Sequence, residues 1–428
     1  MNSFVLQNVQ LASGEVTSIK IGNGIVESLG SDIKAEHIID CSGLIALPGF
    51  VDLHTHLREP GFEASETVLT GSQSAALGGF TALHAMANTN PVADTAGVVE
   101  QVQALGVAAG LVDVFPIGAV TFGLEGKLLA ELGAMANSRA QVRVFSDDGK
   151  CVSDPLLMRR ALEYVKAFDG VIAQHAQDPR LTEGSQMNAG AVSSELGLAG
   201  WPAVAEESII ARDIMLAELT GSRLHVCHVS TAGSVEQIRL GKARGVRVTA
   251  EVTPHHLLLT DELARTYDPV YKVNPPLRTE NDVLALRAAL VDGTIDIVAT
   301  DHAPHPDESK DCEWNAAAFG MLGLETAASI VQSVLIDSGA SDWLRFVEVM
   351  STKPAEISGI SGQGLGIKVG APANLALIDP GAKREIHGGG ASKSANQPFE
   401  GMTLPGAVVH TVFRGVFTVR DGKLVERG

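Results

Sequence analysis

Gly49-Phe50-Val51-Asp52-Leu53-His54-Thr55-His56 is the stretch of sequence that decides the fold. The run is short and apolar and follows Leu47-Pro48, which is typical of a buried strand that ends at the two histidines. Side chains alternate faces along a strand, so His54 and His56 are expected to point the same way. Two imidazoles on one face can bind a single metal ion, or they can simply pack at the end of a strand.

The middle of the chain alternates between strand-like and helix-like segments. Counting Phe50 to His56, the strand candidates number eight, and the others are 80–86, 112–120, 142–148, 171–176, 224–229, 246–252 and 295–300. Helix-like segments lie between them, at 65–77, 154–168, 231–243, 280–291 and 324–335. Eight such units predict an α/β fold, a closed (β/α)8 TIM-type barrel. The alternative is an open doubly wound sheet, but no Gly-rich phosphate loop follows the first strand.

Both ends of the chain have a different texture from the middle. Short alternating segments punctuated by Gly and Asn occur before residue 47, and similar segments recur at 373–378, 408–413 and 416–419. These ends predict one small β-sandwich domain assembled from both termini. The expected division is 1–47 and 362–428 for the two parts of the sandwich, and 48–361 for the barrel.

Composition limits the class of protein and its partners. The chain has 428 residues, 45% hydrophobic and 19% charged, with a net charge of −18. Such a core-rich acidic protein is not expected to bind nucleic acid or an anionic membrane. The four cysteines are scattered, with no C-x-x-C pair, and no apolar run approaches membrane-spanning length. We therefore expect a cytoplasmic protein with reduced thiols.

Polar side chains gather where the predicted strands end. In a barrel of this type the active site lies at the carboxyl ends of the strands. The side chains expected there are His54, His56, Arg58, Asn88, Asp147 or Asp148, His175, His228 and Asp301. Four histidines and two carboxylates would satisfy two zinc ions, with one carboxylate shared. Arg58, in the loop after the first strand, suggests an anionic substrate.

Several neighbouring residues compete for these roles. Asp147 and Asp148 are separated only by strand alternation, which favours Asp148 if Val142, Val144 and Ser146 face inward. Lys150 is expected to face solvent, but it would be a rival ligand if carboxylated. His225 faces away from His228 and is expected to pack or to support the site from outside. His302 is expected to face away from Asp301. His255 and His256 are expected in a loop, where one of them could support the site but neither is a ligand.

Taken together, the motifs resemble those of the bacterial class I dihydroorotases, in the amidohydrolase superfamily. The resemblance covers nearly the whole chain. It depends on the segments Asp52 to Gly61, Asn88-Thr89-Asn90-Pro91, Asp147-Asp148-Gly149, Val226 to Ser230, Ala250 to Leu257, Asn274 to Arg278 and Ala299 to His305.

The resemblance implies a ligand set and a substrate. His54, His56 and Asp301 would hold one zinc ion, His175 and His228 the other, and Asp148 would bridge them. Asp301 would be the catalytic residue. Substrate contacts would come from His56, Arg58, Asn88, Asn274, His305, Phe319 and Gly320. Two departures are visible: Ala87 stands where many relatives have Pro, and Gln177 where relatives carry an acidic residue, which would change hydrogen bonding around His175.

The implied reaction is the reversible cyclisation of N-carbamoyl-L-aspartate to L-dihydroorotate, in the de novo synthesis of UMP. The implied assembly is a homo-oligomer, namely a dimer, with an aspartate transcarbamoylase left open as a partner. Two alternatives stand beside this hypothesis. One is another cyclic amidase, a hydantoinase or allantoinase, whose metals are usually bridged by a carboxylated lysine. The other is a non-catalytic paralogue that supports aspartate transcarbamoylase, although such paralogues typically lack metal ligands.

Overall fold

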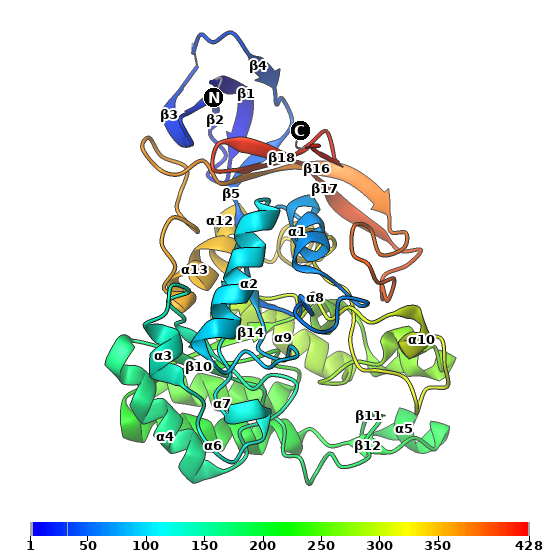
Figure 1. Cartoon of the computed structure of the whole chain (residues 1–428). Coiled ribbons are helices and arrows are strands. Elements are labelled where there is room, and N and C mark those ends of the chain that lie inside the picture. Colours follow the sequence, from blue (N-terminus) through cyan, green and yellow to red (C-terminus); the bar gives the residue numbers. More distant parts are fainter. Residues whose placement is uncertain (1–2, 32, 427–428) are drawn as a thin grey trace.

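The computed structural model describes residues 3–31 and 33–426. A β-rich part formed by both chain ends lies at one end of the molecule, and the strands and helices of the middle of the chain form the larger remainder (Figure 1). Within these described ranges, none of the helices combines the length and apolar character that a membrane crossing needs.

The middle of the chain contains eight parallel strands in two sheets. One sheet has the order β6-β7-β8, and the other has the order β15-β14-β13-β10-β9. Their bounds are β6 Phe50–Thr55, β7 Phe80–Ala85, β8 Asp113–Pro116, β9 Val144–Phe145, β10 Val171–Gln174, β13 Arg223–Val226, β14 Val248–Val252 and β15 Ile297–Val298. Single parallel bridges, Gly118 to Phe145 and Thr55 to His302, connect the two sheets at both edges. All eight strands predicted from the sequence are present, and each is shorter than predicted.

Helices alternate with these strands, and local sequence explains where several of them begin. Thr67 and Thr70 form a reciprocal capping box at the start of α1, and Asp154 caps α4 with Pro155 in its first turn. The longer helices are α1 Val68–Leu77, α2 Ala96–Ala109, α4 Pro155–Val165, α6 Val204–Thr220, α7 Ala232–Ala243 and α9 Glu280–Asp292. The shorter ones are α3 Leu132–Ala136, α5 Ala191–Leu196, α8 Pro254–Leu258, α10 Asp307–Lys310, α11 Ala327–Gln332, α12 Trp343–Val347 and α13 Lys353–Ser358. Both α2 and α6 were absent from the sequence prediction.

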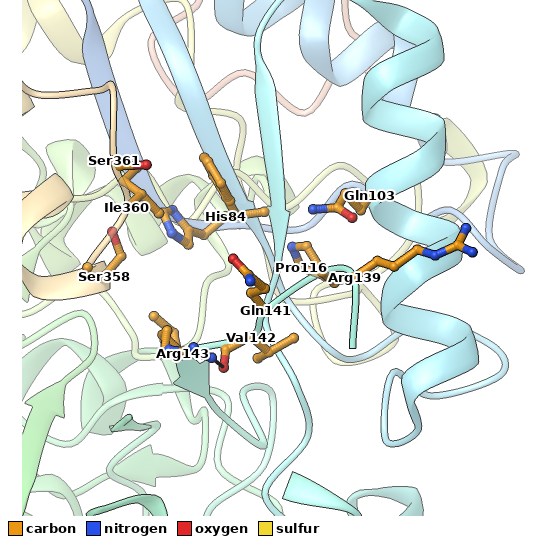
Figure 2. Close-up of a pocket in the computed structure, with 14 residues that line it drawn as sticks. His84, Gln103, Pro116, Arg139, Gln141, Val142, Arg143, Ser358, Ile360 and Ser361 are labelled. Atoms are coloured by element: carbon orange, nitrogen blue, oxygen red, sulfur yellow. Dashed lines mark hydrogen bonds between the residues drawn. The ribbon is translucent and has the colours of Figure 1, made fainter. Parts of the chain in front are cut away.

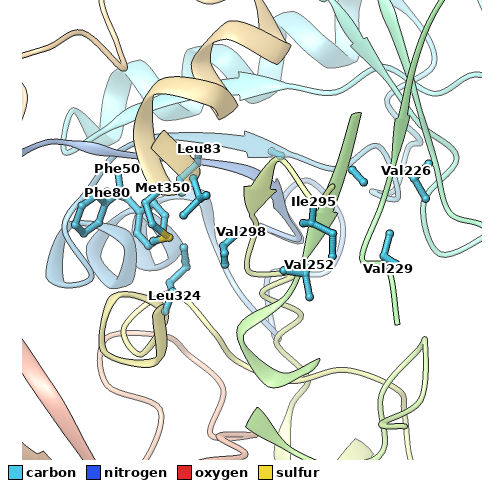
Figure 3. Packing of buried hydrophobic residues seen from close by; sticks show 14 of the residues in the cluster. Phe50, Phe80, Leu83, Val226, Val229, Val252, Ile295, Val298, Leu324 and Met350 are labelled. Carbon is cyan, nitrogen blue, oxygen red and sulfur yellow. The ribbon is translucent and has the colours of Figure 1, made fainter. Parts of the chain in front are cut away.

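The main hydrophobic core lies between the strands and the helices. Figure 3 shows part of it, where Phe50 of β6 and Phe80 of β7 lie together and Val252 and Val298 extend the cluster along β14 and β15. The Phe50 and Phe80 rings meet edge to face with centroids 5.7 Å apart. Each fully buried phenylalanine contributes on the order of 2–3 kcal/mol through burial. Phe50 and Phe80 are the first residues of β6 and β7, so this packing helps to fix where these two strands begin.

The two chain ends build one hydrogen-bonded sheet. Its order is β19-β18-β17-β16-β5-β1-β2-β3, and β4 pairs in parallel with the first half of β1. Strand β5 of the N-terminal part pairs with β16 of the C-terminal part, with Ala376 opposite Leu47. The bounds are β1 Phe4–Leu11, β2 Val16–Gly22, β3 Ile25–Gly30, β4 Ile38–Asp40, β5 Ile45–Pro48, β16 Leu375–Glu385, β17 Thr403–Phe413, β18 Val416–Arg420 and β19 Lys423–Leu424. A small separate sheet pairs β11 Met187–Asn188 with β12 Gly200–Trp201.

Candidate metal centre

The six side chains predicted as metal ligands lie together at the carboxyl ends of the strands. His54 is in β6 and His56 follows it directly, while the others follow β9, β10, β13 and β15 by one to three residues. All six are buried, with at most 5% of any of them exposed: His54, His56, Asp148, His175, His228 and Asp301. A cluster of this kind can form only if the strand ends meet around one point.

One half of the cluster combines two histidines with two carboxylates. Nε2 of His56 lies 3.0 Å from Oδ1 of Asp301 and 3.2 Å from Oδ2 of Asp148. Nε2 of His54 lies 3.3 Å from Oδ2 of Asp148 and 3.4 Å from Oδ1 of Asp301. The four ligand atoms therefore surround a common point.

The other half uses the second oxygen of Asp148. Oδ1 of this carboxylate lies 3.1 Å from Nδ1 of His175 and 3.1 Å from Nε2 of His228. The two ring nitrogens lie 2.9 Å from each other. Asp148 thus stands between the two halves and offers one oxygen to each.

These distances fit metal coordination. Ligands held at about 2.0–2.1 Å from a tetrahedral zinc ion are roughly 3.3 Å apart, close to the spacings observed here. Nε2 of His54 is buried and makes no hydrogen bond within the described residues, although two carboxylates face it. A buried nitrogen lone pair directed at carboxylates needs a cation between them.

The carboxylates of the cluster are held in their charged form. Burial alone raises the pKa of Asp148, but His54, His175 and His228 outweigh burial and hold that pKa well below its usual range. Burial likewise raises the pKa of Asp301, yet His54 and His56 lower it to about 2. Both carboxylates are therefore ionised at neutral pH, and two buried negative charges this close need positive partners.

Three residues of the site have strained backbone conformations. Arg58, His228 and Asp301 adopt left-handed backbone conformations with φ of 63°, 32° and 47°. Such conformations cost non-glycine residues on the order of 1–3 kcal/mol and persist where the surroundings fix them. At each of these three positions the unusual φ helps to determine the direction in which the side chain leaves its strand end.

A cavity of about 300 Å³ opens beside the cluster. All seven side chains predicted to contact substrate line it: His56, Arg58, Asn88, Asn274, His305, Phe319 and Gly320. Arg58 is held by Nε, which donates to the carbonyl of Pro304 at 3.1 Å, and burial lowers its pKa to about 10, so it stays charged at neutral pH. Oδ1 of Asn274 is buried and bonds none of the described residues, which leaves it free to accept a hydrogen bond from a ligand.

Comparison with known proteins agrees with this arrangement. A family model described as dihydro-orotase-like matches residues 43–234. A dihydroorotase from Leifsonia xyli subsp. xyli is 66% identical over 427 residues, which cover 99% of this chain and 98% of that protein. A dihydroorotase from Streptomyces coelicolor is 62% identical over 427 residues, which cover 99% of this chain and all of that protein (100%). The chain belongs to the dihydroorotase family.

Solved structures place this dihydroorotase-family chain close to other cyclic amidases in fold. The L-hydantoinase (dihydropyrimidinase) from Arthrobacter aurescens superposes with a TM-score of 0.88 at 26% identity, over 100% of this chain and 98% of that one. The similarity of fold does not by itself separate the two kinds of enzyme, so the distinction depends on the residues at the site.

Glu251, in β14, is a supporting residue of this family member to which sequence reasoning gave no role. Its Oε1 lies 2.6 Å from Nδ1 of His54 and also accepts from the backbone N–H of His228 at 3.2 Å. Its Oε2 lies 2.9 Å from Nε2 of His225. The signal for Glu251 was a carboxylate between Ala250 and Val252 in a predicted strand, because a buried carboxylate must have partners.

The histidines outside the cluster have other roles. His225 pairs with Glu251 and so supports the site from outside, as predicted. His302 turns away from Asp301, and its Nε2 lies 3.4 Å from Oε2 of Glu66. His255 and His256 lie in the short helix α8, so their assignment to a loop was wrong. The preceding Thr253-Pro254 starts that helix, with the Thr253 hydroxyl capping it and Pro in its first turn.

The neighbouring aspartates separate clearly in the structure. Asp147 points away from the histidines and accepts from the backbone N–H groups of Val120 and Thr121 at 2.8 and 2.9 Å. Asp148 alone of the pair faces the cluster. Lys150 is exposed, as expected for a solvent-facing side chain.

Gln177 occupies the position at which the sequence departs from the family pattern. Its Oε1 lies 2.7 Å from Nε2 of His175, on the side of the ring opposite Asp148. The same oxygen accepts from Nδ2 of Asn274 at 3.1 Å. Gln177 therefore connects a cluster histidine to a side chain of the substrate cavity.

A separate cavity, of about 200 Å³, lies beside β7, β8 and the start of β9 (Figure 2). His84 is the one histidine in its wall, and none of the lining residues is acidic. Nδ1 of His84 is 3.0 Å from the carbonyl of Asp52 and donates to it, because a carbonyl oxygen only accepts. Burial lowers the pKa of His84 to about 4, so the ring is neutral. Without carboxylates or a second histidine this cavity has no ligand set for a metal.

Proposed function

We propose that this chain is a dihydroorotase, which catalyses the reversible cyclisation of N-carbamoyl-L-aspartate to L-dihydroorotate in de novo pyrimidine (UMP) synthesis. The observation that carries the proposal is a buried His/Asp cluster that shares one cavity with a fixed arginine. The identity of 66% with a dihydroorotase over nearly the full length supports the same assignment. A carboxylate-bearing cyclic amide matches both the cluster and Arg58.

The proposed cofactor is two zinc ions per chain. His54, His56 and Asp301 would hold one, His175 and His228 the other, and Asp148 would contribute one oxygen to each. Imidazole and carboxylate ligands suit zinc, and the burial of the cluster excludes competing water. When bound, such ions lower the pKa of a water molecule and polarise the amide carbonyl.

Asp301 is the proposed acid and base. In hydrolysis its carboxylate takes the proton of the attacking water and delivers it to the amide nitrogen that leaves. In ring closure the same group works in the opposite sense. Oδ1 of Asp301 lies 3.0 Å from Nε2 of His56, and both residues line the cavity. The carboxylate of Asp301 is therefore close both to a proposed zinc ligand and to the space proposed for the substrate.

The other cavity residues would bind and orient the substrate. The Arg58 guanidinium would pair with the substrate carboxylate, because a buried carboxylate needs a charged partner. Asn88 lies 2.9 Å from Nδ1 of His56 and fixes that ring, and Asn274 would accept from a substrate N–H through its unpaired oxygen. His305, Phe319 and Gly320 would complete the wall around the ring.

The finer description of the fold is also a proposal. The bridges at both sheet edges support closure of the eight strands into a (β/α)8 barrel over residues 48–361. The nine-stranded sheet of both chain ends would form a β-sandwich from 1–47 and 362–428, and the pairing of β5 with β16 supports their assembly in one domain.

The proposal extends to the compartment and the assembly of the enzyme. Scattered free cysteines support a reducing, cytoplasmic compartment. Exposed apolar side chains on α6, Met215 and Leu219, support a homo-oligomer such as a dimer. An aspartate transcarbamoylase partner is kept as a hypothesis, which co-elution of the two purified proteins would test.

The alternative functions make different demands on the site. A hydantoinase or allantoinase would act on uncharged rings, for which the half-buried Arg58 has no partner, and its usual lysine bridge has no counterpart here because Lys150 is exposed. A non-catalytic paralogue would not need the full set of buried ligands.

Metal analysis of the purified protein combined with hydrolysis assays tests the proposal. We expect about two zinc ions per chain and hydrolysis of dihydroorotate in preference to simple hydantoins. Faster turnover of uncharged hydantoins would assign the chain to the other cyclic amidases, and full activity of a metal-free preparation would refute the metal centre.

A further inference from the structure

The connection between β16 and β17, residues 386–402, contacts the loops that carry the substrate cavity. Figure 1 shows this connection leaving the terminal sheet. The hydroxyl of Ser394 donates to the carbonyl of Ser65 at 2.7 Å, and the backbone N–H of Lys393 donates to Glu66 at 3.1 Å. A segment far from the cluster in sequence is thereby fixed against the loop that follows β6.

Asn396 is the point at which this connection meets two other loops. Its Nδ2 donates to the carbonyls of Ala303 at 2.9 Å and Gly320 at 3.1 Å. Its Oδ1 accepts from the backbone N–H of His305 at 3.2 Å, and its own carbonyl accepts from Leu322 at 3.1 Å. The side chain is 4% exposed, so these bonds are made away from competing water.

The two loops that Asn396 joins form one side of the substrate cavity. Ala303, His305, Phe319 and Gly320 all line it. Nε2 of His305 lies 2.8 Å from the carbonyl of Phe319 and 3.3 Å from Nη2 of Arg58. A Cβ added at Gly320 would come within 2.8 Å of the His305 ring, so the two loops are closely packed where they meet.

We infer that Asn396 is a positioning residue for substrate binding, which holds the His305 and Gly320 walls of the cavity in register from outside the barrel strands. The inference rests on the proposed function, since it takes those walls to be the substrate's. Asparagine suits the position because one side chain must donate to two carbonyls and accept from one N–H. No other common side chain of this size presents that combination.

The test compares Asn396→Asp and Asn396→Ala with the matched change Asn374→Asp. Asn374 is also a buried asparagine that bonds two backbone groups, the carbonyl of Gly362 at 2.9 Å and the N–H of Arg414 at 2.8 Å, but it does not line the substrate cavity. Steady-state kinetics with dihydroorotate, zinc content and hydrogen exchange of the 303–322 peptides are measured for each protein.

We expect both Asn396 variants to raise KM about tenfold while kcat stays within about threefold, because the fraction of molecules with assembled walls falls to about one tenth. Zinc content is expected to be unchanged, and the 303–322 peptides to exchange faster. Asn374→Asp is expected to lose about as much thermal stability as the Asn396 variants lose, but its KM for dihydroorotate is expected to stay unchanged.

An unchanged KM in folded Asn396 variants, or the same change in Asn374→Asp, would overturn the inference. A fall in kcat with loss of zinc would also overturn it, since Asn396 would then act through the metal centre. If Asn396→Asp does not fold, Asn396→Ser, whose hydroxyl donates to a single carbonyl, carries the same test. Failure of the wild type to hydrolyse dihydroorotate would refute the proposed function, whereas unchanged hydrogen exchange in the variants would refute the role of Asn396.

Discussion

The carboxylate of Glu251 determines how His54 faces the cluster. Oε1 of Glu251 lies 2.6 Å from Nδ1 of His54, which therefore carries the proton and donates it. With a metal ion bound, this leaves the lone pair for the metal on Nε2, the atom that faces Asp148 and Asp301 at 3.3 and 3.4 Å. Partners of this kind fix both the tautomer and the orientation of a ligand histidine.

Glu251→Gln is expected to weaken zinc binding by about 10–100-fold. In the wild type both oxygens of Glu251 face nitrogen atoms of histidines, and in the variant one of those oxygens is replaced by an N–H₂ group, which cannot accept a hydrogen bond. Chelator competition on the purified variant measures the change. Glu206→Gln is the control, since Glu206 is a buried carboxylate that bonds the N–H of Ser230 at 2.9 Å and lies outside the cluster. Equal zinc affinity in the Glu251 variant and the wild type would show that His54 is oriented by packing alone.

A pair of adjacent substitutions tests the assignment of the shared ligand. Asp148→Asn is expected to lose at least one zinc ion and activity, because an oxygen directed at each half of the cluster becomes a neutral amide. Asp147→Asn is expected to keep both ions and lose about 1–3 kcal/mol of unfolding free energy, since its carboxylate accepts from Val120 and Thr121. Zinc loss in Asp147→Asn alone would reverse the assignment.

The strand ends could be predicted from the sequence because each strand is an apolar run that stops at a polar residue. His54, His56, His175, His228 and Asp301 were found in this way. The choice between Asp147 and Asp148 needed the phase of a strand that has only two residues, Val144 and Phe145, in regular pairing. A short strand gives too few alternations for the phase to be certain from the sequence.

The residues that were missed act across long distances in sequence. Glu251 supports His54 from a strand 197 residues away, and Asn396 reaches His305 across 91 residues. No local pattern encodes such contacts, because they depend on how strands and loops meet in space. Helix α6 was missed for a related reason: Glu206 and Asp213 are buried on it, and these charged residues break the apolar stripe that would reveal a helix.

Gln177→Glu is expected to tighten zinc binding at the His175 side by up to about tenfold, because a carboxylate accepting from a ligand histidine raises its basicity. Gln177 now offers a neutral oxygen to Nε2 of His175 at 2.7 Å. Chelator competition, which resolves the weaker of the two ions, measures the effect. Unchanged affinity would mean that the neutral amide already fixes the ring as well as a carboxylate does.

Lys310 gives an expected pH dependence of stability. Burial, with Lys272 nearby, lowers the pKa of Lys310 to about 7, and its ammonium donates only to the carbonyls of Pro269 and Lys272. Between that value and the unfolded pKa of about 10.4 the unfolded chain binds the proton and the folded chain does not, so this group makes stability rise with pH. The rise is at most about 1.4 kcal/mol per pH unit.

Urea unfolding of the wild type and Lys310→Met from pH 6.5 to 9 isolates this contribution. The difference in unfolding free energy between the two proteins should change across the range, with the wild type gaining relative to the variant as pH rises. Lys127→Met, at a position whose side chain is 76% exposed, should show a constant difference from the wild type. A constant difference for Lys310→Met as well would mean that Lys310 stays protonated when buried.

Asp301→Asn tests the chemistry itself. Asp301 lies 3.0 Å from His56 in the cavity wall, and His54 and His56 keep its carboxylate ionised despite burial. A carboxylate can accept a proton and an amide of the same shape cannot. The five other ligand side chains remain, so the variant should fold and keep much of its zinc. Its rate should fall by about 10²–10⁴-fold in both directions, because one group serves as base in hydrolysis and as acid in ring closure.

The decisive measurement is the turnover of Asp301→Asn with its zinc content determined on the same sample. Loss of zinc would make a low rate uninformative, so rates are compared per bound metal and after added zinc. Near-normal turnover with metal bound would show that Asp301 is only a structural ligand. His305 would then be the next candidate for the base, because it lines the same cavity as Asp301. Burial and the neighbouring Arg58 lower its pKa to about 3, so its ring is neutral but weakly basic.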